Sequence, residues 1–106
     1  MVINNDRNMS SNKEIERAIE GLGSGWELKE DKILKSFQFP SFMKAIEFVN
    51  DIAKIAERVN HHPIITINWR TVKLALKSFD VNTITKRDII LAKEIEKAVA
   101  NSSNST

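Results

Sequence analysis

His61 and His62 stand side by side, and they are the only histidines in the chain. Histidine is the side chain that most readily gains and loses a proton near neutral pH. Pro63 follows directly and favours an extended backbone at His62, so the two rings should point in different directions. Two such rings can serve two separate proton transfers, and the pair is therefore a candidate for general acid–base catalysis.

Glu57 precedes His61 by four residues, one turn back on the helix that the sequence predicts before the pair. A carboxylate in this place can orient an imidazole ring and favour its protonated form. The end of the helix also favours a positive charge. Glu57 is therefore a candidate to pair with His61 and orient its ring.

Two other interpretations of these residues remain open. A histidine near a helix end is commonly a surface or capping residue without catalytic use. Glu57 and His61 also have the i, i+4 spacing of two metal ligands on one helix face. Since the chain holds no cysteine and no third histidine to complete a ligand set, we predict no metal.

The composition bounds the class of protein. A chain of 106 residues, with 42% hydrophobic and 28% charged residues, fits one domain with one core. The net charge of +2 is too small to indicate direct nucleic-acid binding. No apolar run approaches the ~18 residues of a membrane span, and the first residues lack the pattern of a signal peptide. We therefore expect a cytoplasmic protein that does not bind membranes.

Three segments have the apolar period of amphipathic helices. Ser11 and Glu14 form a capping box before the first, which should end in the glycine-rich segment 21–25. Thr85 and Asp88 form a second capping box before the last helix, which should continue to about residue 100.

The middle helix has the clearest apolar stripe and should span residues 42–59. Ser41 can cap its start, and Pro63 requires its end near Asn60. The predicted buried stripe consists of Phe42, Ala45, Ile46, Val49, Ile52, Ala53, Ala56 and Val59.

Alternating and β-branched residues predict two hairpins. In the first, Glu30 and Asp31 form the turn before a strand over residues 33–39. In the second, Trp69 and Arg70 connect a strand beginning at Ile64 to a strand over residues 71–79.

The order helix-strand-strand-helix-strand-strand-helix predicts an α+β fold with a four-stranded antiparallel sheet and the helices packed on one face. Residues 11–100 should form a single domain, with disordered segments at 1–10 and 101–106. The other sheet face, with Thr71, Lys73 and Lys77, should be open to solvent or to a ligand.

The spacing of the chemical residues resembles a known family. Glu57 stands three residues before the His61-His62-Pro63 triplet, Trp69 follows five residues after it, and Asp88 lies in the later segment TITKRDIILAKEIE. This pattern resembles that of the pterin-4a-carbinolamine dehydratases (4a-hydroxytetrahydrobiopterin dehydratases) over residues 12–100.

The resemblance implies dehydration of a 4a-hydroxytetrahydropterin to the quinonoid dihydropterin without a cofactor. It implies that His61 and His62 transfer the protons, with Glu57 polarising His61. Pro63 and Trp69 would contact the flat pterin, and Asp88 would complete the polar wall. Trp69 could instead serve packing or a subunit contact.

Phe79 departs from the pattern, because the family has a histidine there. A phenylalanine cannot carry a proton, although it can stack on a pterin ring. This residue keeps an alternative function open, a non-catalytic pterin-binding or protein-assembly and coactivator module on the same fold. The family also implies a homodimer or homotetramer, which would pair an exposed edge strand.

Overall fold

The computed structural model describes residues 12–23 and 25–104. The predicted order of helices and strands is confirmed. Along the chain the elements are α1 (Asn12–Glu20), β1 (Glu27–Lys29), β2 (Lys32–Gln38), α2 (Phe42–Val59), β3 (Ile64–Asn68), β4 (Thr71–Leu76) and α3 (Lys86–Asn104).

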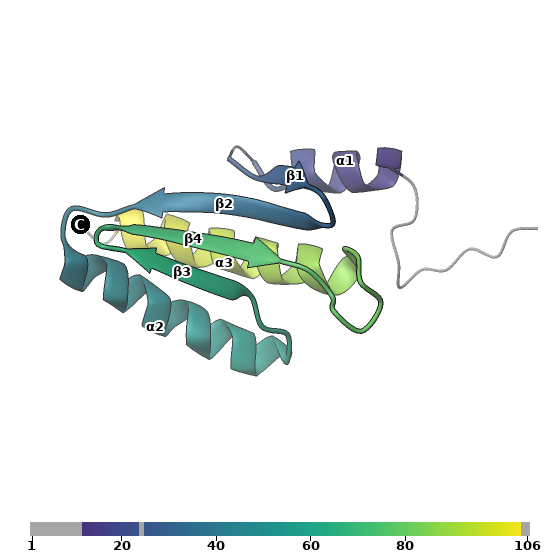
Figure 1. The fold of residues 1–106 in the computed structure, drawn as a ribbon. Helices are drawn as coiled ribbons and strands as arrows, with labels where there is room; N and C mark the ends of the chain where they lie inside the picture. Colours follow the sequence, from purple (N-terminus) through teal and green to yellow (C-terminus); the bar gives the residue numbers. More distant parts are fainter. Residues whose placement is uncertain (1–11, 24, 105–106) are drawn as a thin grey trace, which may run out of the picture.

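The four strands form one antiparallel sheet in the order β1-β2-β4-β3. β4 therefore lies inside the sheet, and β3 lies at an edge with β4 as its one neighbour (Figure 1). In the β3–β4 register, Thr66 faces Lys73 and Ile67 faces Val72. The predicted four-stranded sheet is confirmed.

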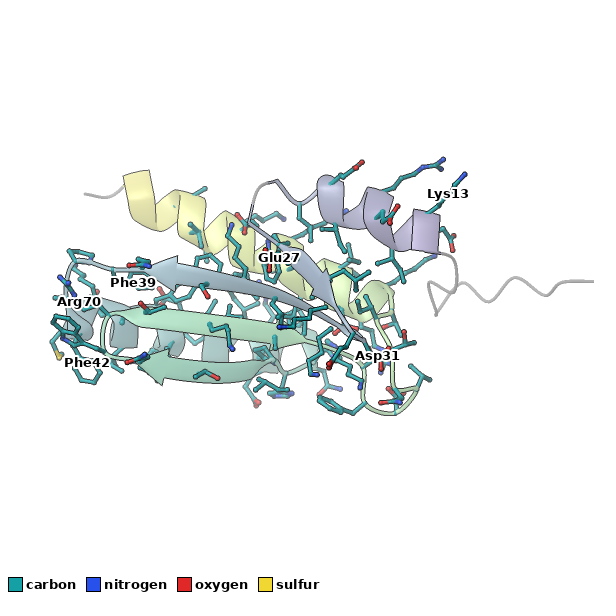
Figure 2. The ribbon with its side chains drawn as sticks, turned by 45° about the horizontal axis from the view of Figure 1, so that its top comes forward. Lys13, Glu27, Asp31, Phe39, Phe42 and Arg70 are labelled. Atoms are coloured by element: carbon teal, nitrogen blue, oxygen red, sulfur yellow. The ribbon has the colours of Figure 1, made fainter. Side chains whose placement is uncertain are left out.

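α2 and α3 cover the same face of the sheet, as Figure 2 shows by placing both behind the strands. Val72, Leu74 and Leu76 alternate along β4 and are fully buried against this layer. Side chains that alternate along a strand point to opposite faces, so the core lies on the helical side. The predicted one-sided packing of the helices is confirmed.

Both ends of α2 form as the sequence predicts. The Ser41 side chain accepts a hydrogen bond from the Lys44 backbone N–H at its start. Asn60 takes the left-handed conformation at its end, with φ 58° and ψ 44°. The backbone N–H groups of Asn60 and His61 both donate to the Ala56 carbonyl. This cap turns the chain sharply before the two histidines.

The predicted stripe of α2 is partly wrong. Phe48 and Ile55 belong to its buried face, whereas Phe42 and Ala53 are exposed. Phe48 packs with its ring centroid 4.9 Å from that of Phe37 on β2, so contact with the sheet, and not the ideal helical period, decides the buried face.

Three further predictions need correction. β4 ends at Leu76, not at residue 79. Lys77 is buried and does not lie on the open sheet face, and its ammonium nitrogen lies 3.8 Å from Oδ2 of Asp31 and 5.4 Å from the centroid of the Phe79 ring. α3 continues to Asn104, since the segment after residue 100 contains no glycine or proline to end it.

The predicted turns at Glu30 and Trp69 are confirmed, and both residues have positive φ. The Ser11 side of the first capping box lies outside the described residues, as do the predicted disordered residues 1–10. Within the part of the chain that the structure describes, no helix is long and apolar enough to cross a membrane.

Candidate active site

Each histidine ring is hydrogen-bonded to a different carboxylate. The Nε2 atom of His61 lies 2.6 Å from Oδ1 of Asp88, at the start of α3. The Nε2 atom of His62 lies 2.6 Å from Oε2 of Glu57, in the last turns of α2. The two adjacent rings lie in the segment between α2 and β3. One is thus hydrogen-bonded to a carboxylate near the end of α2, and the other to a carboxylate at the start of α3.

The predicted pairing of Glu57 with His61 is wrong, because Glu57 pairs with His62. The i, i+4 rule that suggested it applies to residues of one continuous helix. The helix ends at Val59, and the left-handed Asn60 redirects the chain. His61 therefore points toward α3, where its ring is hydrogen-bonded to Asp88.

The carboxylate of Asp88 is fully buried, and neighbouring hydrogen-bond donors contact both of its oxygens. Its Oδ2 accepts hydrogen bonds from the Ser78 hydroxyl at 2.7 Å and from the Thr85 backbone N–H at 3.0 Å. The Ser78 and Thr85 hydroxyl oxygens are themselves 2.8 Å apart. Asp88 therefore completes the predicted capping box with one oxygen and holds His61 with the other.

The two pairs differ in exposure to solvent. The side chains of His61 and Asp88 are 12% and 0% exposed. Those of His62 and Glu57 are 56% and 78% exposed. One ring is therefore fixed in a low-dielectric environment, while the other remains in contact with water.

The carboxylates also fix which ring nitrogen is available for chemistry. An ionised carboxylate can only accept a hydrogen bond, so Nε2 of each ring must be the donor. Among the described residues neither Nδ1 atom has a hydrogen-bond partner. Each Nδ1 can then act as a base when the ring is neutral and as an acid when it is protonated.

Phe79 lies next to this network in sequence and is exposed. The Lys77 ammonium nitrogen lies 5.4 Å from the centroid of its ring and 3.8 Å from Oδ2 of Asp31. A cation over an aromatic face is an attractive contact. Phe79 is therefore an exposed ring that Lys77 supports from one side.

Trp69 is not brought to the histidines within one chain. It follows β3 at the β3–β4 turn, whereas Pro63 precedes β3 at its other end. Six residues of extended chain span ~20 Å. Figure 2 labels Arg70, the neighbour of Trp69, at the end of the sheet opposite Asp31. The predicted contact between Trp69 and the site thus finds no support inside a single subunit.

Ser78 is the buried site residue that the sequence analysis did not identify. The signal was present, because Ser78 continues the alternation Val72, Leu74, Leu76 on the buried face. A hydroxyl at the next inward position after a strand indicates a buried hydrogen-bond partner.

Two further properties of the surroundings are relevant. Among the described residues no group of three or more His, Asp or Glu side chains could hold a metal ion. The Arg87 guanidinium donates to Asp80 at 2.7 Å and holds the pKa of that exposed carboxyl below its ordinary value.

The chain is similar to proteins of a known family. The family model described as pterin 4 alpha carbinolamine dehydratase matches residues 8–98. A relative from Roseiflexus sp. (strain RS-1) is 42% identical over 87 residues, which cover 82% of this chain and 92% of the relative. One from Rickettsia canadensis (strain McKiel) is 36% identical over 88 residues, covering 82% and 81%. Both carry the provisional name pterin-4-alpha-carbinolamine dehydratase.

Two solved structures share the fold. A crystal structure from Brucella melitensis, described as a transcriptional coactivator/pterin dehydratase, has a TM-score of 0.79 at 28% identity and covers 85% of this chain and 97% of that one. A pterin dehydratase-like protein, described as a RuBisCO assembly factor in the alpha-carboxysome, has a TM-score of 0.58 at 19% identity. It covers 72% of this chain and 90% of that one, and the likeness concerns the fold alone.

Proposed function

Since this chain belongs to the pterin 4 alpha carbinolamine dehydratase family, we propose that it dehydrates a 4a-hydroxytetrahydropterin by general acid–base catalysis. The C4a–O bond breaks and the hydroxyl leaves as water after it receives a proton. The proton on N5 is removed, and the electrons of the N5–H bond form the C4a=N5 double bond of the quinonoid dihydropterin. The reaction therefore needs one proton donor and one proton acceptor close together.

The observation that carries the proposal is the pair of adjacent rings with their Nε2 atoms held 2.6 Å from two separate carboxylates. This leaves Nδ1 of His61 and Nδ1 of His62 for the two proton transfers. Asp88 and Glu57 act as positioning residues that fix the tautomer of each ring. Water can restore the proton state of the exposed His62 ring after each turnover, while the buried His61 ring keeps its orientation.

Two residues beside the rings complete the proposed substrate site. Pro63 fixes the backbone after His62, and the exposed ring of Phe79 offers a surface on which a flat pterin can stack. Asp88 contributes through His61, because its oxygens are occupied by the buried network.

Stopped-flow measurement of the dehydration of a freshly generated 4a-hydroxytetrahydropterin tests the proposal. Loss of either proton carrier should lower the rate by about 10²–10⁴-fold, so we expect this loss in His61→Ala and in His62→Ala. The matched control is Asn60→Gly, which keeps the left-handed cap and should react at the wild-type rate. A wild-type rate equal to the uncatalysed rate would refute the enzyme function.

Phe79 supports a second candidate, a non-catalytic pterin-binding or protein-assembly module. The Brucella protein is described as a transcriptional coactivator/pterin dehydratase, and the carboxysome protein is described as an assembly factor. The substitution Phe79→His separates the two functions, with Phe79→Leu as control for loss of the ring. If Phe79 faces the pterin in an active enzyme, His should raise turnover and Leu should weaken binding. If neither variant changes turnover or pterin affinity, Phe79 lies outside a pterin site.

A further inference from the structure

Lys77 is a buried cation that is only loosely paired. Its side chain is 10% exposed, and its ammonium nitrogen lies 3.8 Å from Oδ2 of Asp31, beyond hydrogen-bond distance. Asp31 is itself 54% exposed, so water screens this ion pair. Among the residues that the structure describes, no oxygen accepts a hydrogen bond from the Lys77 ammonium. Buried donors are normally paired, so this ammonium is suited to an acceptor on a ligand.

Lys77 stands beside the histidine site. The β3–β4 pairing begins two residues after His62 and ends two residues before Lys77. Ser78 follows Lys77 directly, and its hydroxyl donates to the same carboxylate that the His61 ring contacts. This shared carboxylate keeps the two segments together beyond the last pair of the ladder. Lys77 therefore borders the histidine segment from the end of β4.

Phe79 gives this cation an aromatic neighbour. Its ring is exposed, and the Lys77 ammonium nitrogen lies 5.4 Å from the ring centroid. An exposed aromatic ring can stack on a flat molecule. An ammonium group carries three donors and no acceptor. The two residues together suit a flat ligand that has a hydrogen-bond acceptor at its edge.

The proposed substrate has such an acceptor beside its reacting carbon. The 2-amino group and the ring N–H groups of a 4a-hydroxytetrahydropterin are hydrogen-bond donors and cannot accept from an ammonium. The carbonyl oxygen on C4 is an acceptor, and C4 is bonded directly to C4a, from which the hydroxyl leaves. A side chain that binds this carbonyl must therefore lie next to the groups that transfer the protons, as Lys77 does.

We propose that the Lys77 ammonium donates a hydrogen bond to the C4 carbonyl oxygen of the pterin and thereby selects 4-oxo pterins. The inference rests on the proposed function, since it names a residue that recognises the substrate in the same site. The carbonyl is present before, during and after dehydration, so Lys77 contributes to affinity more than to the chemical step. A 4-amino pterin would turn N–H donors toward the ammonium and should bind weakly.

Equilibrium binding of two stable dihydropterins tests the inference without turnover. One carries the 4-oxo group, and the other is its 2,4-diamino counterpart. A hydrogen bond to a charged group changes affinity by about 10–100-fold, so the wild-type protein should prefer the 4-oxo compound by this factor. Isothermal titration calorimetry measures both dissociation constants. Equal affinities, or no binding of either compound, would overturn the proposal.

Lys77→Met keeps an unbranched side chain but removes the donors. It should weaken binding of the 4-oxo compound by about 10–100-fold and abolish the preference, whereas Lys77→Arg should retain a preference because the guanidinium still donates. Lys73→Met is the matched control, since Lys73 is an exposed lysine of β4 and should leave both affinities unchanged. If Lys77 only supports the Phe79 ring, Lys77→Met weakens both compounds equally, and an unchanged ratio would overturn the proposal.

The ¹⁵Nζ signal of Lys77 gives a second measurement on the wild-type protein, which does not depend on the folding of a variant. The signal is assigned by its loss in Lys77→Arg. It should shift on addition of the 4-oxo compound and much less with the diamino compound. The same small shift with both compounds would contradict a hydrogen bond to the carbonyl.

Stopped-flow kinetics separates this inference from the proposed dehydration. If the wild-type protein is active, Lys77→Met should raise KM and leave kcat nearly unchanged, because the lost contact is made equally in the ground state and the transition state. A loss confined to kcat would overturn the role of Lys77 and leave the dehydration intact. If the wild-type protein is inactive but prefers the 4-oxo compound, the dehydration is refuted and the Lys77 contact stands in a pterin-binding site.

Discussion

The His61–Asp88 and His62–Glu57 pairs have the same separation of 2.6 Å but opposite surroundings. Asp88 is fully buried and is held by Ser78 and Thr85, whereas Glu57 is mostly exposed. A buried pair depends on a complete set of hydrogen bonds, because an unpaired charge there is costly. A solvent-exposed pair contributes little and is screened by salt. Equal distances therefore do not indicate equal importance.

The largest difference between the pairs should appear on truncation of the two carboxylates. Asp88→Ala removes the capping box and leaves Ser78, Thr85 and His61 without their acceptor. We expect a loss of about 3–5 kcal/mol in the free energy of unfolding. The same change at the exposed pair, Glu57→Ala, should cost at most about 1 kcal/mol. Urea denaturation measures both, and similar losses would contradict the comparison.

Asp88→Asn tests the tautomer without removing the side chain. The amide oxygen can still accept from Ser78 and Thr85, which leaves the NH₂ group facing His61. Nε2 of His61 must then accept, and Nδ1 carries the proton. We expect dehydration to slow by about 10²–10⁴-fold through loss of one acid–base group. The ¹⁵N shifts of the His61 ring report the tautomer, and an unchanged Nε2–H would disprove this explanation.

Ser78→Ala should weaken the buried pair indirectly. It removes one of the two donors to Oδ2 of Asp88 and also removes the hydrogen bond between the Ser78 and Thr85 hydroxyls. Loss of a buried hydrogen bond costs about 1–3 kcal/mol. Ser36→Ala is the control, because Ser36 is exposed on β2 and should change stability by less than about 0.5 kcal/mol. Equal unfolding midpoints for the two variants would show that Ser78 does not support Asp88.

The sequence predicted the elements that rest on local rules. The Ser41 cap, the end of α2 before Pro63 and the turns at Glu30 and Trp69 follow from residues adjacent in the chain. The alternating side chains of β4 predicted its buried face for the same reason.

Predictions failed where residues distant in sequence decide the contact. Asp88 reaches His61 across 27 positions, and a single left-handed residue, Asn60, decides which ring meets Glu57. No helical spacing rule predicts either contact. Trp69 belongs to the family spacing, but the extended strand β3 separates it from the histidines of its own chain, and its contact with a pterin stays a prediction.

Glu57→Gln should have a smaller effect than the matching change at Asp88. The glutamine oxygen can still accept from Nε2 of His62, and water competes for the same contact. Since an exposed pair is worth about 0–1 kcal/mol, dehydration should slow by less than about tenfold, the factor that ~1.4 kcal/mol represents. The effect should shrink further at high salt, where exposed charges are screened. A loss as large as that of Asp88→Asn would make the two pairs equivalent.

The smallest effect should come from a carboxylate outside both pairs. Arg87 lowers the pKa of Asp80 chiefly through its hydrogen bond and also through its charge. Arg87→Gln should therefore raise the pKa of Asp80 toward its ordinary value, whereas Arg87→Lys should keep it partly lowered. A folded-state pKa below the unfolded value stabilises the fold above the unfolded value, and this contribution is lost as pH falls through the folded pKa. The Gln variant should lack this contribution near neutral pH, and the difference in stability from the wild type should disappear as pH falls below the folded-state pKa of Asp80. Carboxyl ¹³C titration measures the pKa, and an unshifted Asp80 in the Gln variant would contradict the role of Arg87.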